Sequence, residues 1–382
     1  MKYVSSLTVN LHDVIIIGGG LAGLTAAIHL ADSGHDVVLF ESKEYPHHKV
    51  CGEYVSNEIL PYLERLGVDV FSKGAIRISN FEISSVKGRK VAVKLPLGGF
   101  GMSRFAFDHL LYQKAIEKGV QCYFEKVTGI AFIENQFTIR THIGKSYYGK
   151  VAIGAYGKRS ALDRSLNRNF IFDKNSWLAV KSHYRSSGFP ETKVALHNFE
   201  GGYGGLSKTE SGAVNFCYLA HYDSFKKYQD VERFNKVVVS QNPHLGDFLK
   251  KSEPLFNSPM TIAQISFGKK EPVIDHMLMC GDTAGLIHPL CGNGMAMAIH
   301  SAKLASECIH EFLTGEKLSR AVLEKTYTSL WSDTFKKRLW FGRKLQNVLL
   351  SKQWTNLGVR AVSNSTSLLK YIITKTHGKP IT

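Results

Sequence analysis

The stretch 13–41 constrains the fold more than any other part of the chain, because it reads as strand, glycine turn, helix and strand. The uninterrupted apolar run 14–17 predicts a parallel strand that is covered on both faces. Gly18, Gly20 and Gly23 then have the G-x-G-x-x-G spacing. This spacing permits a tight turn, lets a pyrophosphate approach the backbone and lets the helix lie close to the strand. The order of these elements predicts a dinucleotide site.

The residues that follow the glycines support the same interpretation. We expect a helix over 21–33, with Gly34 as its terminator and with its N-terminal amides facing the phosphates. A second strand over 36–40 ends at Glu41, which lies eighteen residues after Gly23. An acid at about this distance typically binds the ribose, so Glu41 is expected to accept hydrogen bonds from adenosine hydroxyls.

Length and composition bound the remaining possibilities. The 382 residues suffice for two domains, and 44% hydrophobic with 21% charged residues is typical of a globular protein. No apolar run approaches the length of a spanning helix, and the N-terminal apolar stretch is a strand rather than a signal peptide, so a cytoplasmic protein is expected. The six cysteines form no C-x-x-C pair, which predicts reduced thiols and no metal site.

The net charge of +16 is concentrated at the C-terminus. Residues 334–382 contain ten Lys or Arg and no acid, interleaved with apolar residues as in a basic amphipathic tail. Such a tail can pack over the rest of the protein with its lysines in water, or it can lie on the inner, cytoplasmic face of an anionic membrane. The lack of acids favours the membrane. No recognition motif supports nucleic acid as a partner.

The middle of the chain interrupts the pattern set by the first strands. Residues 178–220 alternate with period two, which predicts antiparallel sheet, and the glycine-rich segment 201–205 suggests a break between strands. A short apolar strand at 277–280 and a helix over 294–312 return to the first pattern. The order predicts a discontinuous cofactor domain with an inserted sheet. The expected bounds are 1–75, 100–160 and 271–315 for the cofactor domain, 76–99 and 161–270 for the substrate-cavity sheet, and 316–382 for the helical tail.

Four further segments carry a resemblance to a known family. The loop 46–53, the helix start 104–108, and the segments 281–285 and 289–295 together resemble the geranylgeranyl reductase family. This family belongs to a larger group of FAD enzymes that includes aromatic hydroxylases and flavin halogenases. The resemblance covers nearly the whole chain and implies an α/β fold. In that fold a Rossmann-type FAD-binding domain carries an inserted antiparallel β-sheet substrate domain and a C-terminal helical tail.

The resemblance makes FAD the expected cofactor. Asp282 would bind a ribityl hydroxyl, and Arg104 would lie over the pyrophosphate. The backbone around Pro289 and Gly292 would approach the isoalloxazine at a helix start, where the helix dipole stabilises an anion. The expected FAD-binding residues are Gly18, Gly20, Leu21, Ala22, Gly23, Glu41, Ser42, Arg104, Asp282, Pro289, Gly292, Gly294 and Met295.

Departures from the family patterns narrow the chemistry. The hydroxylase turn G-x-D-G has Tyr156 in place of its aspartate, which leaves the external electron donor open between NAD(P)H and ferredoxin. His47 stands where the reductases usually have an arginine, and it is a pH-dependent cation. The tryptophan signature W-x-W-x-I-P of the halogenases is missing, so halogenation is not expected.

Three residues are candidates for catalysis, and each has a simpler alternative. Cys51 would touch the isoalloxazine or the substrate, or would only pack as a small polarizable side chain. His288 has the pKa range of a general acid near neutral pH, but loop histidines are commonly solvated. Tyr203 would form part of the cavity wall, or would belong to the core.

Together these features predict an FAD-dependent oxidoreductase that reduces carbon–carbon double bonds of a lipophilic, isoprenoid- or polyketide-like substrate by hydride transfer from reduced flavin. The alternative is a monooxygenase of the same fold, and a non-catalytic flavin or lipid carrier is the contrasting class. The expected partner is a lipophilic small molecule, with peripheral membrane contact through 334–382. The sequence leaves the oligomeric state open, and a monomer is the simplest expectation.

Overall fold

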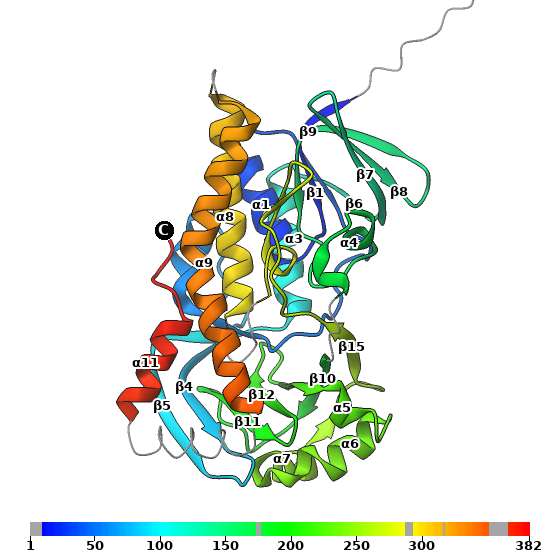
Figure 1. Ribbon diagram of the computed structural model, residues 1–382. Coiled ribbons are helices and arrows are strands. Elements are labelled where there is room, and N and C mark those ends of the chain that lie inside the picture. The colour runs from blue at the N-terminus through cyan, green and yellow to red at the C-terminus, as the bar shows by residue number, and fades with distance from the viewer. Residues whose placement is uncertain (1–9, 173–176, 287–292, 316–317, 351–365) are drawn as a thin grey trace, which may run out of the picture.

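The computed structural model describes residues 10–172, 177–286, 293–315, 318–350 and 366–382. Two β-sheets organise these residues, one in the upper half of Figure 1 and one in the lower half. The long helices α8 (Gly294–Thr314) and α9 (Arg320–Leu350) run side by side along one side of the molecule. The predicted α/β class, with an antiparallel sheet and C-terminal helices, is confirmed.

The first sheet contains the predicted N-terminal strand at its centre. Its strand order is β16 (Val273–Ile274), β17 (Met277–Met279), β9 (Ser146–Gly154), β1 (Leu11–Ile17), β2 (Val37–Phe40) and β6 (Gln121–Tyr123). The neighbours from β17 to β6 are parallel, and the hairpin β7 (Val127–Ile133) and β8 (Gln136–Thr141) extends the sheet beside β9. Residues 14–17 are at most 3% exposed, as an apolar run in a covered parallel strand predicts.

The register of the parallel strands sets the position of the glycine turn. Ile17 pairs with Phe40 on one side and with Gly154 on the other, so these three strands end at the same edge of the sheet. Ligands of open parallel sheets bind outside this carboxyl edge. The turn that follows β1 therefore lies at the edge where a cofactor is expected.

The helix α1 (Leu21–Asp32) follows the glycine turn and matches the predicted helix to within one residue. Its small and apolar residues are buried against α3 (Arg104–Glu117) and α8. The helix ends at Asp32, and Gly34, which follows the C-cap Ser33, has φ +85° and donates its amide to the carbonyl of Ala31. Glycine adopts this left-handed conformation without a steric penalty, which explains the termination.

The second sheet is mainly antiparallel. Its order is β14 (Glu253–Pro254), β10 (Trp177–Arg185), β13 (Val214–His221), β12 (Gly202–Lys208), β11 (Lys193–Phe199), β4 (Ile76–Ser84), β5 (Lys90–Gly101) and β3 (Tyr54–Ser56), and β15 (Met260–Ile265) also pairs with β10. Only β11 and β4 are parallel among these described pairs. The segment 54–56, which the sequence groups with the cofactor domain, forms an edge strand of this sheet.

The glycine-rich segment 201–205 corrects one expectation. Gly201 lies in the turn between β11 and β12, as predicted, but Gly202, Gly204 and Gly205 lie within β12, which pairs with both β11 and β13. A Cβ atom at Gly202 would lie 2.6 Å from the Phe199 ring, and one at Gly204 would lie 2.6 Å from the Phe216 ring. Gly204 therefore makes room for the Phe216 ring, and Gly202 makes room for the Phe199 ring and for the Leu219 carbonyl oxygen, which a Cβ atom there would approach to 2.3 Å, within a regular strand.

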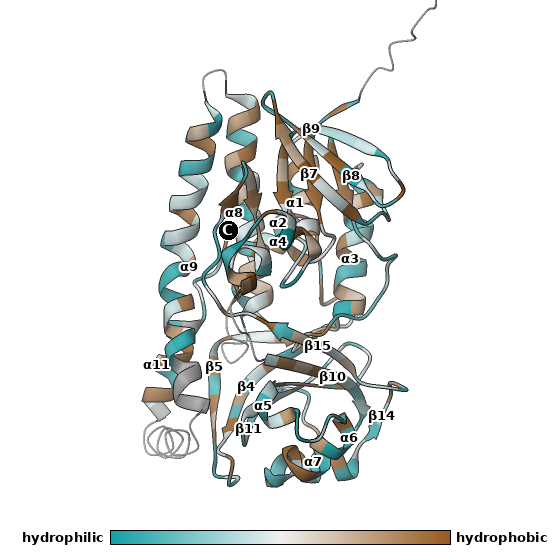
Figure 2. Cartoon of the chain, turned by 45° about the vertical axis from the view of Figure 1, so that its right-hand side comes forward, coloured by the Kyte–Doolittle hydropathy of each residue, from teal (hydrophilic) through white to brown (hydrophobic). Residues whose placement is uncertain are grey.

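Short helices cover one face of the second sheet. Figure 2 shows α6 (Val231–Val237) and α7 (Pro243–Lys251) below β10 and β11, with α5 (Tyr222–Phe225) close by. Phe234, Leu245 and Phe248 of these helices pack with Phe199 and Phe216 of the sheet. The other face of the sheet carries a separate apolar cluster, which faces the first sheet's half of the molecule.

The remaining described elements are short, apart from the C-terminal helix. They are the 3-10 helices η1 (Asn57–Ile59), η2 (Asn169–Phe172), η3 (Val239–Gln241) and η4 (Gly281–Thr283), with the α-helices α2 (Leu60–Arg65) and α4 (Ala161–Ser165). Helix α11 (Thr366–Thr376) packs beside β5 (Figure 1). Within the described ranges, no helix has the length and hydropathy that crossing a membrane requires.

Candidate active site

A cavity of about 950 Å³ lies between the two sheets. Its wall combines the glycine turn after β1, the loop 46–53, the turn after β9, the inner face of the second sheet and helix α11. Most of the predicted site residues that the structure describes lie in this wall: Gly18, Gly20, Leu21, Ala22, Glu41, Ser42, Cys51, Arg104, Tyr203, Asp282, Gly294 and Met295. Segments that are far apart in the sequence thus meet at one cavity.

The glycine turn has the shape that a phosphate group needs. Gly18 has φ +107°, and a Cβ atom there would lie 2.4 Å from the carbonyl oxygen of Ala155. A Cβ atom at Gly23 would lie 1.9 Å from the oxygen of Gly18, so Gly23 lets α1 pack closely although it does not line the cavity. A Cβ atom at Gly20 would have Arg104 Nη2 as its nearest neighbour, at 3.5 Å, so the backbone of Gly20 is open toward the cavity.

The start of α1 offers hydrogen-bond donors to the same space. The N-cap of this helix is Gly20, and no side chain caps its first amides. Leu21 and Ala22 of the first turn line the cavity. Uncapped amides at a helix N-terminus, together with the open backbone of Gly20, fit the pyrophosphate of a dinucleotide.

Glu41 supplies a negative charge beside the glycine turn. Its carboxylate accepts hydrogen bonds from the backbone amides of Gly19, at 3.0 Å, and Ser42, at 2.7 Å. Burial raises the pKa of Glu41, but Lys49 at 3.5 Å and the hydrogen bonds of Ser42 outweigh it and hold the pKa below its ordinary value. The group stays ionised, as an acceptor for ribose hydroxyls must.

Arg104 is held in place by a buried ion pair. Its Nε and Nη2 atoms donate to the two carboxylate oxygens of Asp108, at 2.6 and 2.7 Å, and Lys49 Nζ lies 3.0 Å from the same carboxylate. Burial raises the pKa of Asp108, but Arg104 and Lys49 outweigh it and lower the pKa. The cationic groups of Arg104 and Lys49 lie 3.5 and 4.0 Å from the position of a Cβ atom at Gly20, and this placement suits a pyrophosphate.

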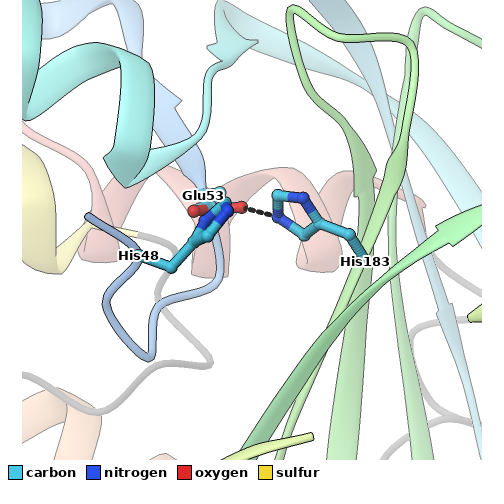
Figure 3. Close-up of side chains that lie close together, drawn as sticks. All are labelled: His48, Glu53 and His183. Carbon is cyan, nitrogen blue, oxygen red and sulfur yellow. Dashed lines mark hydrogen bonds and ion pairs between the residues drawn. The ribbon is translucent and has the colours of Figure 1, made fainter. Parts of the chain in front are cut away.

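The loop 46–53 ends in a buried network around Glu53. Its carboxylate accepts a hydrogen bond from His183 Nε2 at 2.6 Å (Figure 3). It also accepts hydrogen bonds from Lys181 Nζ at 2.5 Å and from the backbone amide of Arg104 at 2.7 Å. Glu53 is fully buried and has φ 55°, a conformation that a non-glycine residue rarely adopts. Burial raises the pKa of Glu53, and His183 and Lys181 together lower it below its ordinary value.

The same place could be considered as a metal site, because ligand atoms of His48, Glu53 and His183 lie within 4.8 Å of one another (Figure 3). However, the ammonium of Lys181 already contacts the Glu53 carboxylate and would repel a cation. The arrangement is better described as an ion-pair network. Its effect is to hold the loop that carries Cys51 against strand β10.

Further hydrogen bonds connect the Cys51 loop to the second sheet. Asn215 Nδ2 donates to the carbonyl of Cys51 at 3.1 Å, and Ser207 Oγ donates to the carbonyl of Gly52 at 3.3 Å. Cys51 is partly exposed to the cavity, and Tyr203 is 4% exposed within the apolar cluster of its wall. Both predicted residues therefore border the cavity, and their contribution to a reaction stays a prediction.

The segments 154–157 and 281–283 lie together in the cavity wall. The amide of Gly157 donates to Thr283 Oγ1 at 2.8 Å. The buried Arg168 donates to Asp163 at 3.1 Å and to the carbonyl of Thr283 at 2.9 Å. Lys270 Nζ donates to the carbonyl of Asp282 at 2.7 Å, and burial lowers the pKa of Lys270 to about 8.

Helix α8 begins at the cavity with Gly294 and Met295. Its N-cap Asn293 forms no side-chain cap and donates instead to the Glu58 carboxylate at 3.2 Å. The predicted residues His288, Pro289 and Gly292 lie outside the described residues.

The sequence analysis did not identify four residues that position the site from strands and turns: Lys181, His183, Arg168 and Lys270. The nearest signal was the pair Lys181 and His183, two residues apart on one strand.

Another part of the cavity wall is apolar. Strands β4 and β5 contribute Ile83 and Leu95, and strand β13 contributes Leu219. Helix α11 contributes Leu369 and Ile373, which are buried in the same cluster. Part of the basic tail thus packs over the second sheet. This packing is one of the two alternatives that the sequence left open for the tail, the other being contact with a membrane.

Comparisons with known proteins agree with this geometry. A family model described as FAD dependent oxidoreductase matches residues 13–50. The digeranylgeranylglycerophospholipid reductase of Methanosarcina acetivorans is 25% identical over 344 residues, which cover 85% of this chain and 81% of that protein. The chain is therefore an FAD-dependent oxidoreductase.

Two solved structures show the same fold. A geranylgeranyl bacteriochlorophyll reductase-like protein from Thermoplasma acidophilum has a TM-score of 0.78 at 19% identity, covering 96% of each chain. A flavin-dependent brominase has a TM-score of 0.79 at 17% identity, covering 96% of this chain and 94% of the other. Within the FAD-dependent oxidoreductases, the resemblance to the geranylgeranyl reductase family is confirmed.

Proposed function

We propose that this protein uses FAD to reduce carbon–carbon double bonds of a lipophilic, isoprenoid-like substrate. The observation that carries the proposal is that one cavity joins the glycine turn and the Arg104 cation to a compartment lined by apolar side chains. A relative whose name specifies a digeranylgeranyl lipid supports the isoprenoid class. When bound, FAD would supply the hydride equivalent for the reduction.

The chain's own residues would bind, orient and exclude water. The Gly20 backbone and the first amides of α1 would hold the phosphates, with Arg104 beside them and Glu41 at the ribose. The apolar wall would hold the hydrocarbon chain and keep water from the reacting carbon. Saturating a double bond also needs a proton, and Cys51 borders the cavity with a thiol that can carry one.

The test uses the purified, FAD-loaded protein. The flavin is reduced with dithionite without oxygen and then mixed with geranylgeraniol or with its saturated counterpart. Return of the oxidised flavin absorbance with geranylgeraniol only, together with a reduced alkene in the product, is the expected result. A hydroxylated product that forms only after oxygen is admitted would identify the alternative, a monooxygenase. If neither product forms, the protein would be a carrier rather than an enzyme.

We further propose that the basic tail contacts an anionic membrane, from which a lipophilic substrate could enter. Trp340 and Tyr371 are each 56% exposed. Lys344 Nζ lies 5.9 Å from the Trp340 ring centre, and Lys375 Nζ lies 5.3 Å from the Tyr371 ring centre. Exposed aromatic rings beside cations are typical of membrane interfaces. Flotation with phosphatidylglycerol vesicles but not with phosphatidylcholine vesicles is expected, and equal flotation would contradict the proposal.

A further inference from the structure

A second, smaller cavity adjoins the main one. It has a volume of about 210 Å³ and lies between residues 95–98 of β5 and residues 373–380 of the C-terminal segment. Leu95, Ile373 and His377 line both cavities. Leu95 and Ile373 are each 5% exposed, so they are packed between the two spaces. These three side chains form a thin partition at the apolar end of the main cavity.

The partition depends on a C-terminal segment that packs against β5 and α9 and is also held by Glu58. Glu58 of η1 is fully buried, and its carboxylate accepts a hydrogen bond from the amide of Gly378. The backbone carbonyl of Glu58 accepts from the amide of Ile381 at 2.7 Å. Arg338 of α9 lies 3.4 Å from the carboxylate. One buried acid thus binds α9 and the last residues of the chain.

Gly378 fits this contact because it has no side chain. A Cβ atom there would lie 2.5 Å from Arg338 Nη2 and 2.8 Å from Glu58 Oε2. A larger residue would force the Arg338 guanidinium or the Glu58 carboxylate to move and would so disturb the ion pair. The same Glu58 carboxylate also accepts from Asn293 at the start of α8, so the segment is connected to the end of the cavity where FAD is expected.

We propose that Ile373 sets the length of apolar chain that the cavity accepts, and that Glu58 is the positioning residue that holds this wall in place. Removing the Ile373 side chain would join the two cavities and let the far end of a linear hydrocarbon enter the second one. The proposal rests on the proposed function only for the lipophilic nature of the ligand. It concerns binding and requires no reaction.

The experiment measures binding of saturated alcohols, which cannot be reduced, to the intact FAD-loaded protein. Dodecanol and octadecanol are titrated as competitors of the fluorescent dye anilinonaphthalene sulfonate, and the ratio of their dissociation constants is the readout. Each additional buried methylene should tighten binding about fourfold. Ile373→Ala should therefore move the ratio toward octadecanol by about tenfold or more, and the milder Ile373→Val by about fourfold.

Glu58→Gln and Gly378→Ala should change the same ratio by several fold, because the wall would no longer be held. The matched controls are Glu64→Gln, an exposed acid on α2, and Lys370→Ala, an exposed residue on α11, and both should keep the wild-type ratio. General loss of structure would weaken the binding of both alcohols together and leave the ratio of their dissociation constants unchanged.

An unchanged ratio in both Ile373 variants would overturn the partition. If the ratio changes in the Ile373 variants but stays at the wild-type value in Glu58→Gln and Gly378→Ala, the role of Glu58 would be overturned. Absence of alkene reduction would affect only the proposed function.

Discussion

Replacing Lys181 by methionine removes the ammonium from the Glu53 network while keeping most of the apolar length of the side chain. Both residues of this pair have fully buried side chains. Breaking a buried ion pair by removing one partner typically costs about 3 to 5 kcal/mol, because the other charge is left uncompensated. Glu53 would keep His183 and the Arg104 amide as donors, so we expect the lower value, about 3 kcal/mol.

Lys193→Met is the matched control in the same sheet. Lys193 Nζ lies 3.3 Å from Glu82, but its side chain is 23% exposed and Glu82 also has Lys90 at 3.4 Å. A partly exposed pair contributes about 0 to 1 kcal/mol. The two substitutions therefore remove the same charge and the same chemistry but differ in burial. Their difference isolates the effect of the buried carboxylate.

The assay is urea unfolding of the FAD-free and FAD-loaded proteins, with the free energy extrapolated to water. The loss in the free energy of unfolding caused by Lys181→Met should become smaller in acid, because a protonated Glu53 carries no charge that the ammonium must compensate. Adding Glu53→Gln to Lys181→Met should recover part of the loss for the same reason. If Lys181→Met lost no more stability than Lys193→Met, the account of Glu53 as a buried, charged anchor would be wrong.

Three other predictions follow from single features of the structure. Gly23→Ala should abolish retention of FAD, measured by flavin absorbance after gel filtration, because its Cβ atom would lie 1.9 Å from the Gly18 oxygen; normal flavin content would contradict this. Cys51→Ala should slow alkene reduction at least tenfold with unchanged flavin content, and unchanged turnover would leave Cys51 a packing residue. Stability should fall as the pH drops from 6.5 toward 4, because burial lowers the pKa of His29 to about 4 and of His197 to about 3. The unfolded state binds protons that these folded histidines do not, so urea titrations should lose on the order of 3 kcal/mol per buried histidine, and a flat profile would refute it.

Local patterns in the sequence predicted those parts of the site that depend on backbone geometry. The run 14–17, the glycine spacing and Glu41 all act within one βαβ unit, where neighbouring residues determine the conformation. The same reasoning held for Gly201, which lies in a turn, and failed for 202–205, which belong to β12. Glycines usually mark turns, and only the rings of Phe199 and Phe216 on neighbouring strands explain why a regular strand needs them there.

The sequence by itself determined the α/β class, the dinucleotide turn, the antiparallel insertion and the resemblance to FAD enzymes, because periodicity and short motifs record local structure. Only the tertiary structure decided what surrounds the reaction space. Glu53 meets Lys181 across 128 positions of the chain, and Glu58 meets Gly378 across 320. Each contact depends on the packing of whole sheets and helices. No local pattern records such a pairing, because the packing of distant elements brings the two groups together and their mutual contact then compensates the cost of burying them.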